Sequence, residues 1–168
     1  MALPGDNGSL ELVIFMGLQA SGKSSFFHAR FASTHVQISK DDFPNNKNPN
    51  RRQLILLEAA LREGRSVICD NTNPTIGDRA PLIALGRSLG ARIVGYYFES
   101  RMEDCLRRNR QREGKKRVPD VAIFATRKKF ECPSLSEGFD QLTYVRMVGE
   151  VDWEESPWIE EGQGNETM

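Results

Sequence analysis

The chain has 168 residues, enough for one domain with a buried core, and it carries 23 basic and 23 acidic residues, so its formal net charge is zero. It contains neither an apolar run of about 18 residues nor a basic start followed by an apolar stretch, so we expect no membrane span and no signal peptide. The three cysteines are widely spaced and form no CxxC pair, which argues against a metal cluster or a disulfide framework and favours a cytoplasmic protein with reduced thiols.

The first predicted element is a buried strand over Leu12–Met16, followed by a glycine-rich turn and a helix over Ser25–Phe31. The turn fits the P-loop pattern with Gly17-Leu18-Gln19-Ala20-Ser21-Gly22-Lys23-Ser24. Its glycines allow backbone N–H groups to surround a phosphate at the start of a helix. Lys23 has the length to reach the β- and γ-phosphates, and the Ser24 hydroxyl is a ligand for Mg²⁺. A chance Gly/Ser loop is the alternative, and the strand-to-helix context argues against it.

The next elements are a short strand over His35–Ser39, a helix over Arg51–Arg62 that Gly64 ends, and a strand over Ser66–Asp70. We then expect a helix at 75–89, a strand at 91–98, helices at 101–112 and 119–129, and a weak strand at 142–148. This alternation predicts an α/β fold, a P-loop NTPase-type parallel sheet flanked by helices. Ligands of such sheets bind beyond the carboxyl ends of the strands, where the P-loop also lies.

Two carboxylates follow predicted strands at this edge. Asp41, with Asp42 beside it, comes directly after the second strand, where a base could orient an attacking hydroxyl; the alternative is a helix or turn cap. Asp70 ends the third strand, where a P-loop protein places a carboxylate near magnesium or its waters; the alternative is an Asx turn before Pro74.

The segment from Arg101 to Phe130 is rich in arginine and lysine. Arg108 and Arg112 are four residues apart on one helix face, and Gly114–Val118 would be the turn of a mobile helical lid. Lid arginines stabilise charge on a transferring phosphoryl group. The alternative for most of the segment is a solvated helix face, and Lys115, for example, could instead contact a nucleic-acid backbone.

The last stretch, 149–168, carries seven acidic residues and no basic one, which leaves 16 acidic and 23 basic residues in the rest of the chain. We therefore expect a kinase domain over 10–148 and a flexible or loosely docked acidic tail over 149–168. The basic body is compatible with a polyanionic partner. The guanine-reading Asn-Lys-x-Asp motif is absent, which weakly favours ATP over GTP as the nucleotide.

Several pieces of the chain together resemble the P-loop 5′-hydroxyl polynucleotide kinases, with the greatest likeness to the kinase module of repair enzymes that also carry a 3′-phosphatase. The P-loop is one piece, and Lys40-Asp41 is another. The others are Val67–Pro74 with its Asp-Asn-Thr-Asn-Pro run, Arg108–Glu113 with Val118-Pro119, and Arg127–Phe139 with its Glu-Gly-Phe end. No phosphatase domain accompanies them.

The resemblance implies ATP and Mg²⁺ as cofactors and a 5′-hydroxyl end of DNA or RNA as acceptor, with Asp41 as general base. The implied catalytic residues are Asp41, Lys23, Arg112, Arg108 and Asp70. The implied ATP-binding residues are Gly17, Gln19, Ala20, Ser21, Gly22, Lys23, Ser24, Ser25, Arg108 and Arg112, with Ser24 on the metal. The implied acceptor-binding residues are Asp41, Asp70, Asn71, Thr72, Asn73 and Arg52.

One departure concerns the acceptor. Phage-type members place a phosphate-clamping arginine three residues after the base, and here that position is Pro44. Two further hypotheses therefore stay open, a small-molecule kinase for a nucleoside or sugar and a non-catalytic nucleotide-binding module. Asp41 argues against the second, because such a module needs no base.

Overall fold

The computed structural model describes residues 8–149 and 151–160. Six strands form one sheet in the order β2-β3-β1-β4-β5-β6. Their bounds are β1 Glu11–Met16, β2 Val36–Ile38, β3 Val67–Cys69, β4 Arg92–Phe98, β5 Gln141–Val148 and β6 Asp152–Pro157. The first five are parallel, and β6 pairs antiparallel with β5 at the edge, in the register Met147 to Trp153.

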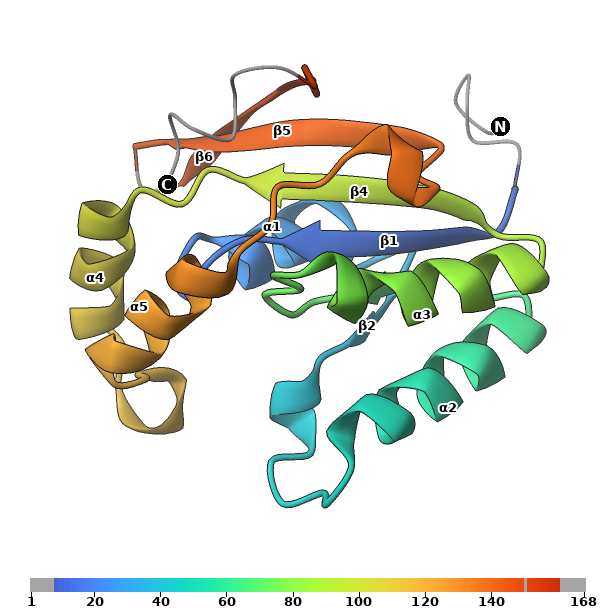
Figure 1. Ribbon diagram of the computed structural model, residues 1–168, viewed down its shortest axis with the longest axis horizontal. Helices are drawn as coiled ribbons and strands as arrows, with labels where there is room; N and C mark the ends of the chain where they lie inside the picture. The colour runs from blue at the N-terminus through green and yellow to red at the C-terminus, as the bar shows by residue number, and fades with distance from the viewer. Residues whose placement is uncertain (1–7, 150, 161–168) are drawn as a thin grey trace.

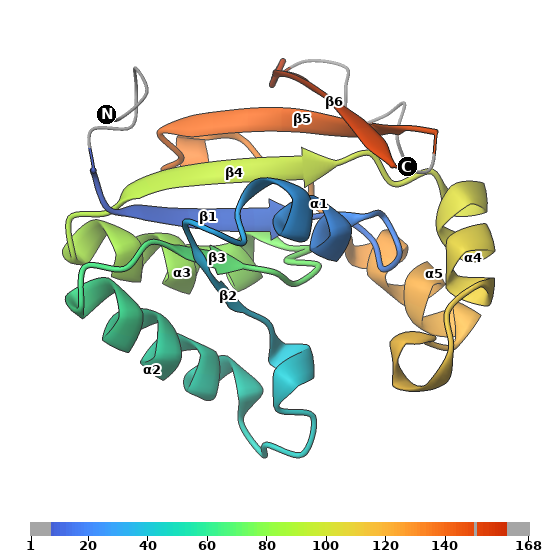
Figure 2. The same ribbon diagram turned by 180° about the vertical axis from the view of Figure 1, so that it is seen from behind.

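The helices lie on both faces of the sheet and at one end of it. Figure 1 shows α2 (Pro49–Arg62) and α3 (Ile76–Ser88) on one face, and Figure 2 shows α1 (Lys23–Arg30) on the other. Beyond the carboxyl ends of the strands stand α4 (Met102–Arg110) and α5 (Asp120–Lys129), joined through the short helix η2 (Gly114–Lys116) (Figure 1). The fold is therefore the predicted α/β P-loop type, with a helical pair where we expected the lid.

The central strand β1 has no polar face because helices cover both sides of it. Leu12, Ile14 and Met16 belong to the apolar cluster under α2 and α3, whereas Val13 and Phe15 belong to the cluster under α1. All five side chains are fully buried, which explains the unbroken apolar run in the sequence.

Polar caps determine where the helices on the α2/α3 face begin. Asn48 precedes Pro49, and its side chain accepts a hydrogen bond from the backbone N–H of Arg51, so α2 begins two residues earlier than we expected. Thr75 and Asp78 form a reciprocal capping box at the start of α3. With this start fixed, α3 continues through Pro81 to Ser88.

The expectation of a flexible or loosely docked tail is wrong for the middle of 149–168. Residues 152–157 form β6, and the Trp153 ring meets the Phe26 ring of α1 edge-on at 5.6 Å. Just after β6, Trp158 contacts Tyr97 with ring centroids 5.1 Å apart. The acidic composition of this segment does not predict a strand. Two aromatic side chains and pairing with β5 stabilise it instead. Residues 161–168 lie outside the described residues.

Candidate active site

The P-loop turns from β1 into α1 through a backbone that only small residues fit. Gly22 caps α1 with φ 97°, and a Cβ at Gly17 would lie 3.0 Å from the Phe98 Cβ. No side chain caps α1, so its first backbone N–H groups, which have no intrahelical acceptor, are available to an anion. The loop thus has the form of a phosphate cradle.

Loops that follow three different strands hold the cradle in place. The backbone N–H of Gly17 donates to the Thr72 carbonyl at 3.1 Å, and that of Leu18 donates to Ser100 Oγ at 3.0 Å. Ser100 Oγ in turn donates to the Phe98 carbonyl at 2.7 Å. The segments after β1, β3 and β4 therefore meet at one point on the carboxyl edge of the sheet.

The Lys23 side chain forms hydrogen bonds with the P-loop that precedes it. Its Nζ donates to the carbonyls of Gly17 and Leu18 at 3.0 and 2.7 Å and to Ser21 Oγ at 3.3 Å, and the residue is 8 % exposed. Burial lowers the pKa of Lys23 to about 8, although the negative charges of Asp70 and Asp41 act in the opposite direction. The ammonium is thus desolvated and ready to meet an anion.

Ser24 and Asp70 form the oxygen-rich side of the cradle. Ser24 Oγ donates to Asp70 Oδ2 at 2.8 Å, and Gln37 Nε2 on β2 donates to the same oxygen at 2.7 Å. Asp70 is 5 % exposed. A hydroxyl beside a carboxylate, at a phosphate cradle, is a donor set that suits Mg²⁺, which prefers hard oxygen ligands and keeps several waters.

Asp41 stands across the site from the lid. It belongs to the short helix η1 (Lys40–Asp42), whose start is fixed by a hydrogen bond from the Asp41 N–H to Ser39 Oγ. Both Asp41 and Asp42 are exposed. The negative charge of Asp41 favours the charged forms of Lys23 and Arg112, so this carboxylate lies within electrostatic reach of both the cradle and the lid.

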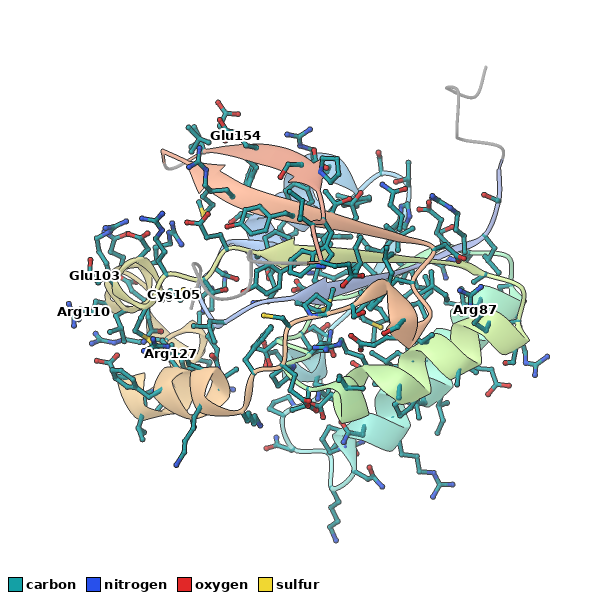
Figure 3. All side chains as sticks on the ribbon, turned by 45° about the horizontal axis from the view of Figure 1, so that its top comes forward. Arg87, Glu103, Cys105, Arg110, Arg127 and Glu154 are labelled. Atoms are coloured by element: carbon teal, nitrogen blue, oxygen red, sulfur yellow. The ribbon has the colours of Figure 1, made fainter. Side chains whose placement is uncertain are left out.

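The lid contacts the cradle through α4 and α5. Arg108 Nη1 donates to the Ala20 carbonyl at 3.3 Å, and Gln19 Nε2 donates to Thr126 Oγ1 on α5 at 3.0 Å. Leu18 packs with Cys105 and Ile123 beneath them. Figure 3 shows Glu103 and Arg110 projecting from the outer side of α4, away from Cys105.

Arg112 lies just beyond α4, where its Nη1 donates to the Lys116 carbonyl at 3.3 Å. Burial lowers the pKa of Arg112, and the charge of Asp41 opposes this effect. Gln19 Oε1 is buried with no hydrogen-bond partner in the part of the chain that the structure describes. The lid therefore presents a partly desolvated cation, and the cradle presents an unsatisfied polar group.

The remaining expected site residues are distributed as follows. Asn71 Oδ1 accepts from the Lys40 N–H at 2.9 Å, and Asn73 Nδ2 donates to the Phe15 carbonyl at 2.8 Å. Ser25 is exposed on the first turn of α1. Arg52 is exposed on α2, and within residues 8–149 and 151–160 its guanidinium forms no ion pair or hydrogen bond. Asn71 and Asn73 are thus fixed beside η1 and β1, whereas Ser25 and Arg52 are exposed on α1 and α2.

Sequence reasoning missed four residues that build the site: Gln37, Ser100, Asn109 and Thr126. Asn109 is fully buried and holds the lid turn, donating to the Val118 carbonyl at 2.7 Å and accepting from the Val118 N–H at 3.0 Å. Asn109 could have been found from the sequence, because it is a polar residue within the apolar stripe of a predicted helix. The other three show no local pattern.

A P-loop after the central strand of a parallel sheet, with a lid across the carboxyl edge, defines the P-loop kinase fold. The chain belongs to the AAA_33 family, whose model, described as an AAA domain, matches residues 12–133.

Among curated proteins, the chain is 26 % identical over 149 residues to the bifunctional polynucleotide phosphatase/kinase of Schizosaccharomyces pombe, covering 87 % of this chain and 36 % of that protein. The putative bifunctional polynucleotide phosphatase/kinase of Acanthamoeba polyphaga mimivirus is also 26 % identical, with 87 % of this chain and 37 % of that protein covered. These matches confirm the resemblance seen in the sequence. The chain spans little more than a third of the length of either relative.

Solved structures share the fold at lower identity. A fungal RNA kinase matches with a TM-score of 0.66 and 13 % identity over 84 % of this chain and 39 % of that one. Chaetomium thermophilum Kti12, solved with ADP-AlF3, matches with a TM-score of 0.62 and 16 % identity over 83 % and 90 % of the two chains. A sugar kinase from Janibacter sp. HTCC2649 matches with a TM-score of 0.61 and 17 % identity over 82 % of this chain and 85 % of that one.

In the described part of our chain, no helix is long and apolar enough to cross a membrane.

Proposed function

We propose that the protein transfers the γ-phosphoryl group of ATP to a 5′-hydroxyl end of DNA or RNA. The observation that supports this proposal is that Asp41, Lys23 and Arg112 lie within electrostatic reach of one another beside the phosphate cradle. The match to polynucleotide phosphatase/kinases over most of the chain supports the choice of acceptor.

The donor half of the site would bind the ATP phosphates. The open N–H groups at the start of α1 and the Lys23 ammonium would surround the β- and γ-phosphates, in place of the loop carbonyls that Lys23 now contacts. Ser24 and Asp70 would hold Mg²⁺ or its waters. This ion would neutralise part of the negative charge on the phosphates. Arg108 and Arg112 would approach the phosphoryl group from the lid.

The acceptor half would deliver the nucleophile from the η1 side. The 5′-oxygen attacks the γ-phosphorus and forms a new P–O bond, while the bond from that phosphorus to the bridging oxygen of ADP breaks. The hydroxyl proton passes to the Asp41 carboxylate. Asn71 would keep η1 at the correct distance through its bond to Lys40.

A kinase for a nucleoside or sugar is the second candidate, because a sugar kinase shares the fold over most of both chains. The donor chemistry would be the same. A non-catalytic module is disfavoured, because an exposed carboxylate opposite the cradle has no use in holding a nucleotide.

The test is Asp41→Asn with Asp42→Asn as its matched control, since both carboxylates are exposed on η1. We expect Asp41→Asn to lower transfer to a 5′-hydroxyl oligonucleotide by at least about 100-fold, the usual contribution of a general base, with ATP affinity nearly unchanged. Asp42→Asn should keep most of the activity. Normal turnover in Asp41→Asn would remove the base assignment, and labelling of nucleosides or sugars alone would favour the second candidate.

A further inference from the structure

A polar cavity of about 80 Å³ lies between the first turns of α2 and α3, beside η1. Its polar lining comes from Lys40, Asn50, Gln53, Asn73 and Asp78. A cavity needs only about 10–15 Å³ to hold one water molecule, so this one has room for a group of several heavy atoms. It is separate from the phosphate cradle, whose residues do not line it.

Gln53 is the buried polar group of this cavity. It is 4 % exposed, and its Oε1 accepts a hydrogen bond from Asn71 Nδ2. Within the described residues, no protein acceptor takes a hydrogen bond from its Nε2. The fully buried side-chain atoms without a partner in the described residues do not include Nε2, so this amide is accessible from the cavity and can donate to a group held there.

Asn71 joins the cavity wall to the acceptor half of the active site. Its side chain bonds Gln53 on α2 and also accepts from the Lys40 N–H. Lys40 directly precedes Asp41, and Asn71 directly follows Asp70. A group seated in the cavity therefore lies against the segments that carry the proposed base and the strand-end carboxylate.

The charges of the lining favour a neutral ligand over a phosphate. Lys40 Nζ donates to Asn50 Oδ1 at 3.1 Å, and Asp78 Oδ2 already accepts from the Thr75 hydroxyl at 2.8 Å in the capping box. One ammonium and one carboxylate cancel in net charge, and the amides offer both donors and acceptors. A hydroxyl group uses both kinds of partner, whereas a phosphate would gain no net attraction from this neutral lining.

The rest of the lining is apolar and consists of Leu54, Pro81 and Leu82, with Gly77 beside them. An apolar wall opposite polar groups suits a sugar ring, which has C–H faces and hydroxyl edges.

We propose that this cavity binds the ribose ring at the acceptor end and that Gln53 meets a ring hydroxyl, so that RNA is preferred over DNA. The inference rests on the proposed function, because it places the ribose beside the hydroxyl that attacks ATP. The 2′-hydroxyl, both donor and acceptor, is the group by which a protein distinguishes RNA from DNA.

The experiment measures kcat/KM with matched 5′-hydroxyl RNA and DNA oligonucleotides and with adenosine and 2′-deoxyadenosine. We expect RNA to exceed DNA by at least about fivefold, the size that one net hydrogen bond supplies. Gln53→Leu removes the open amide and should bring the RNA-to-DNA ratio close to one.

Two further variants keep the test independent of folding. Gly77→Ala narrows the cavity, and because the added Cβ would meet only Thr75 Oγ1, at 3.7 Å, the fold accepts it; it too should lower the ratio. Arg62→Gln, exposed on the last turn of α2, the helix that carries Gln53, should leave the ratio unchanged.

The outcomes separate the two proposals. Equal use of RNA and DNA by the wild type, or a ratio that neither Gln53→Leu nor Gly77→Ala changes, overturns the ribose site while the kinase proposal stands. Phosphorylation of adenosine but of neither oligonucleotide overturns the proposed function. In that case, a preference for adenosine over 2′-deoxyadenosine that Gln53→Leu abolishes would still support a ribose site, and its absence would overturn it.

Discussion

Lys23 is a cation that the protein holds in a desolvated position before any phosphate arrives. Its pKa is lowered to about 8 by burial, and the charge of a bound polyphosphate would raise that pKa again. Binding therefore takes up a proton at alkaline pH. ATP affinity should be nearly constant below about pH 7 and should fall as the pH rises through 8, by up to about tenfold per pH unit.

Calorimetric titration of ATP between neutral and alkaline pH checks this prediction, with Lys23→Met as the comparison. The variant should bind ATP more weakly and should lose the alkaline decline. A decline of the same size in both proteins would assign the titration to another group.

The roles of single residues were predictable where a local sequence motif defines them. They were not predictable where the role depends on a partner far away in the sequence. The P-loop spacing identified Lys23 and Ser24 because the motif is continuous in sequence. Gln37 bonds Asp70 across 33 residues, and Ser100 bonds Leu18 across 82. A glutamine on a short strand or a serine in a turn has many possible roles until the fold selects one.

At the scale of elements, one buried ion pair ties α3 to the short helix η3 (Leu135–Glu137). Arg79 is fully buried and donates to both carboxylate oxygens of Glu137, at 2.8 and 3.1 Å. It also donates to the Asn73 carbonyl at 2.9 Å, so the same guanidinium supports the segment after β3. The Glu-Gly-Phe run of the sequence is thus part of an anchor for the segment after β3.

Arg79→Ala should lower the free energy of unfolding by about 3–5 kcal/mol, because Glu137 would remain buried without its partner. Urea unfolding provides the measurement. Arg62→Ala removes an exposed pair with Glu58 on α2 and should cost less than about 1 kcal/mol. Similar losses in the two variants would show that the Arg79 pair contributes no more than a surface pair.

The elements themselves were mostly predictable from their patterns, and the exceptions have physical causes. Helices and parallel strands were evident because apolar periodicity and glycine stops are local signals. β6 was not, because three of its six residues are acidic and only pairing with β5 and packing of Trp153 make it a strand.

At the scale of the whole molecule, the acidic tail completes the sheet as well as balancing the charge of the body. Deleting 149–168 would remove the pairing with β5 and two tryptophans that pack on α1 and β4. We expect a loss of about 3 kcal/mol or more and a fall in Tm of about 6–12 °C by thermal unfolding.

The companion variant Asp152→Asn/Glu154→Gln keeps the strand and removes two charges from its exposed positions. It should leave the Tm nearly unchanged and should tighten oligonucleotide binding at low salt if the tail shields the basic body. An unaltered Tm in the deletion variant would contradict a structural role for β6.

The contact between Trp153 and Phe26 has a consequence for folding of the protein during its synthesis on the ribosome. The helix that follows the P-loop is among the first elements synthesised, yet the ring that covers it emerges far later. At roughly 5–20 residues per second, the interval is about 6–25 s. During that time Phe26 lacks its cover, so the nascent nucleotide cradle would remain a substrate for chaperones until the antiparallel edge strand arrives.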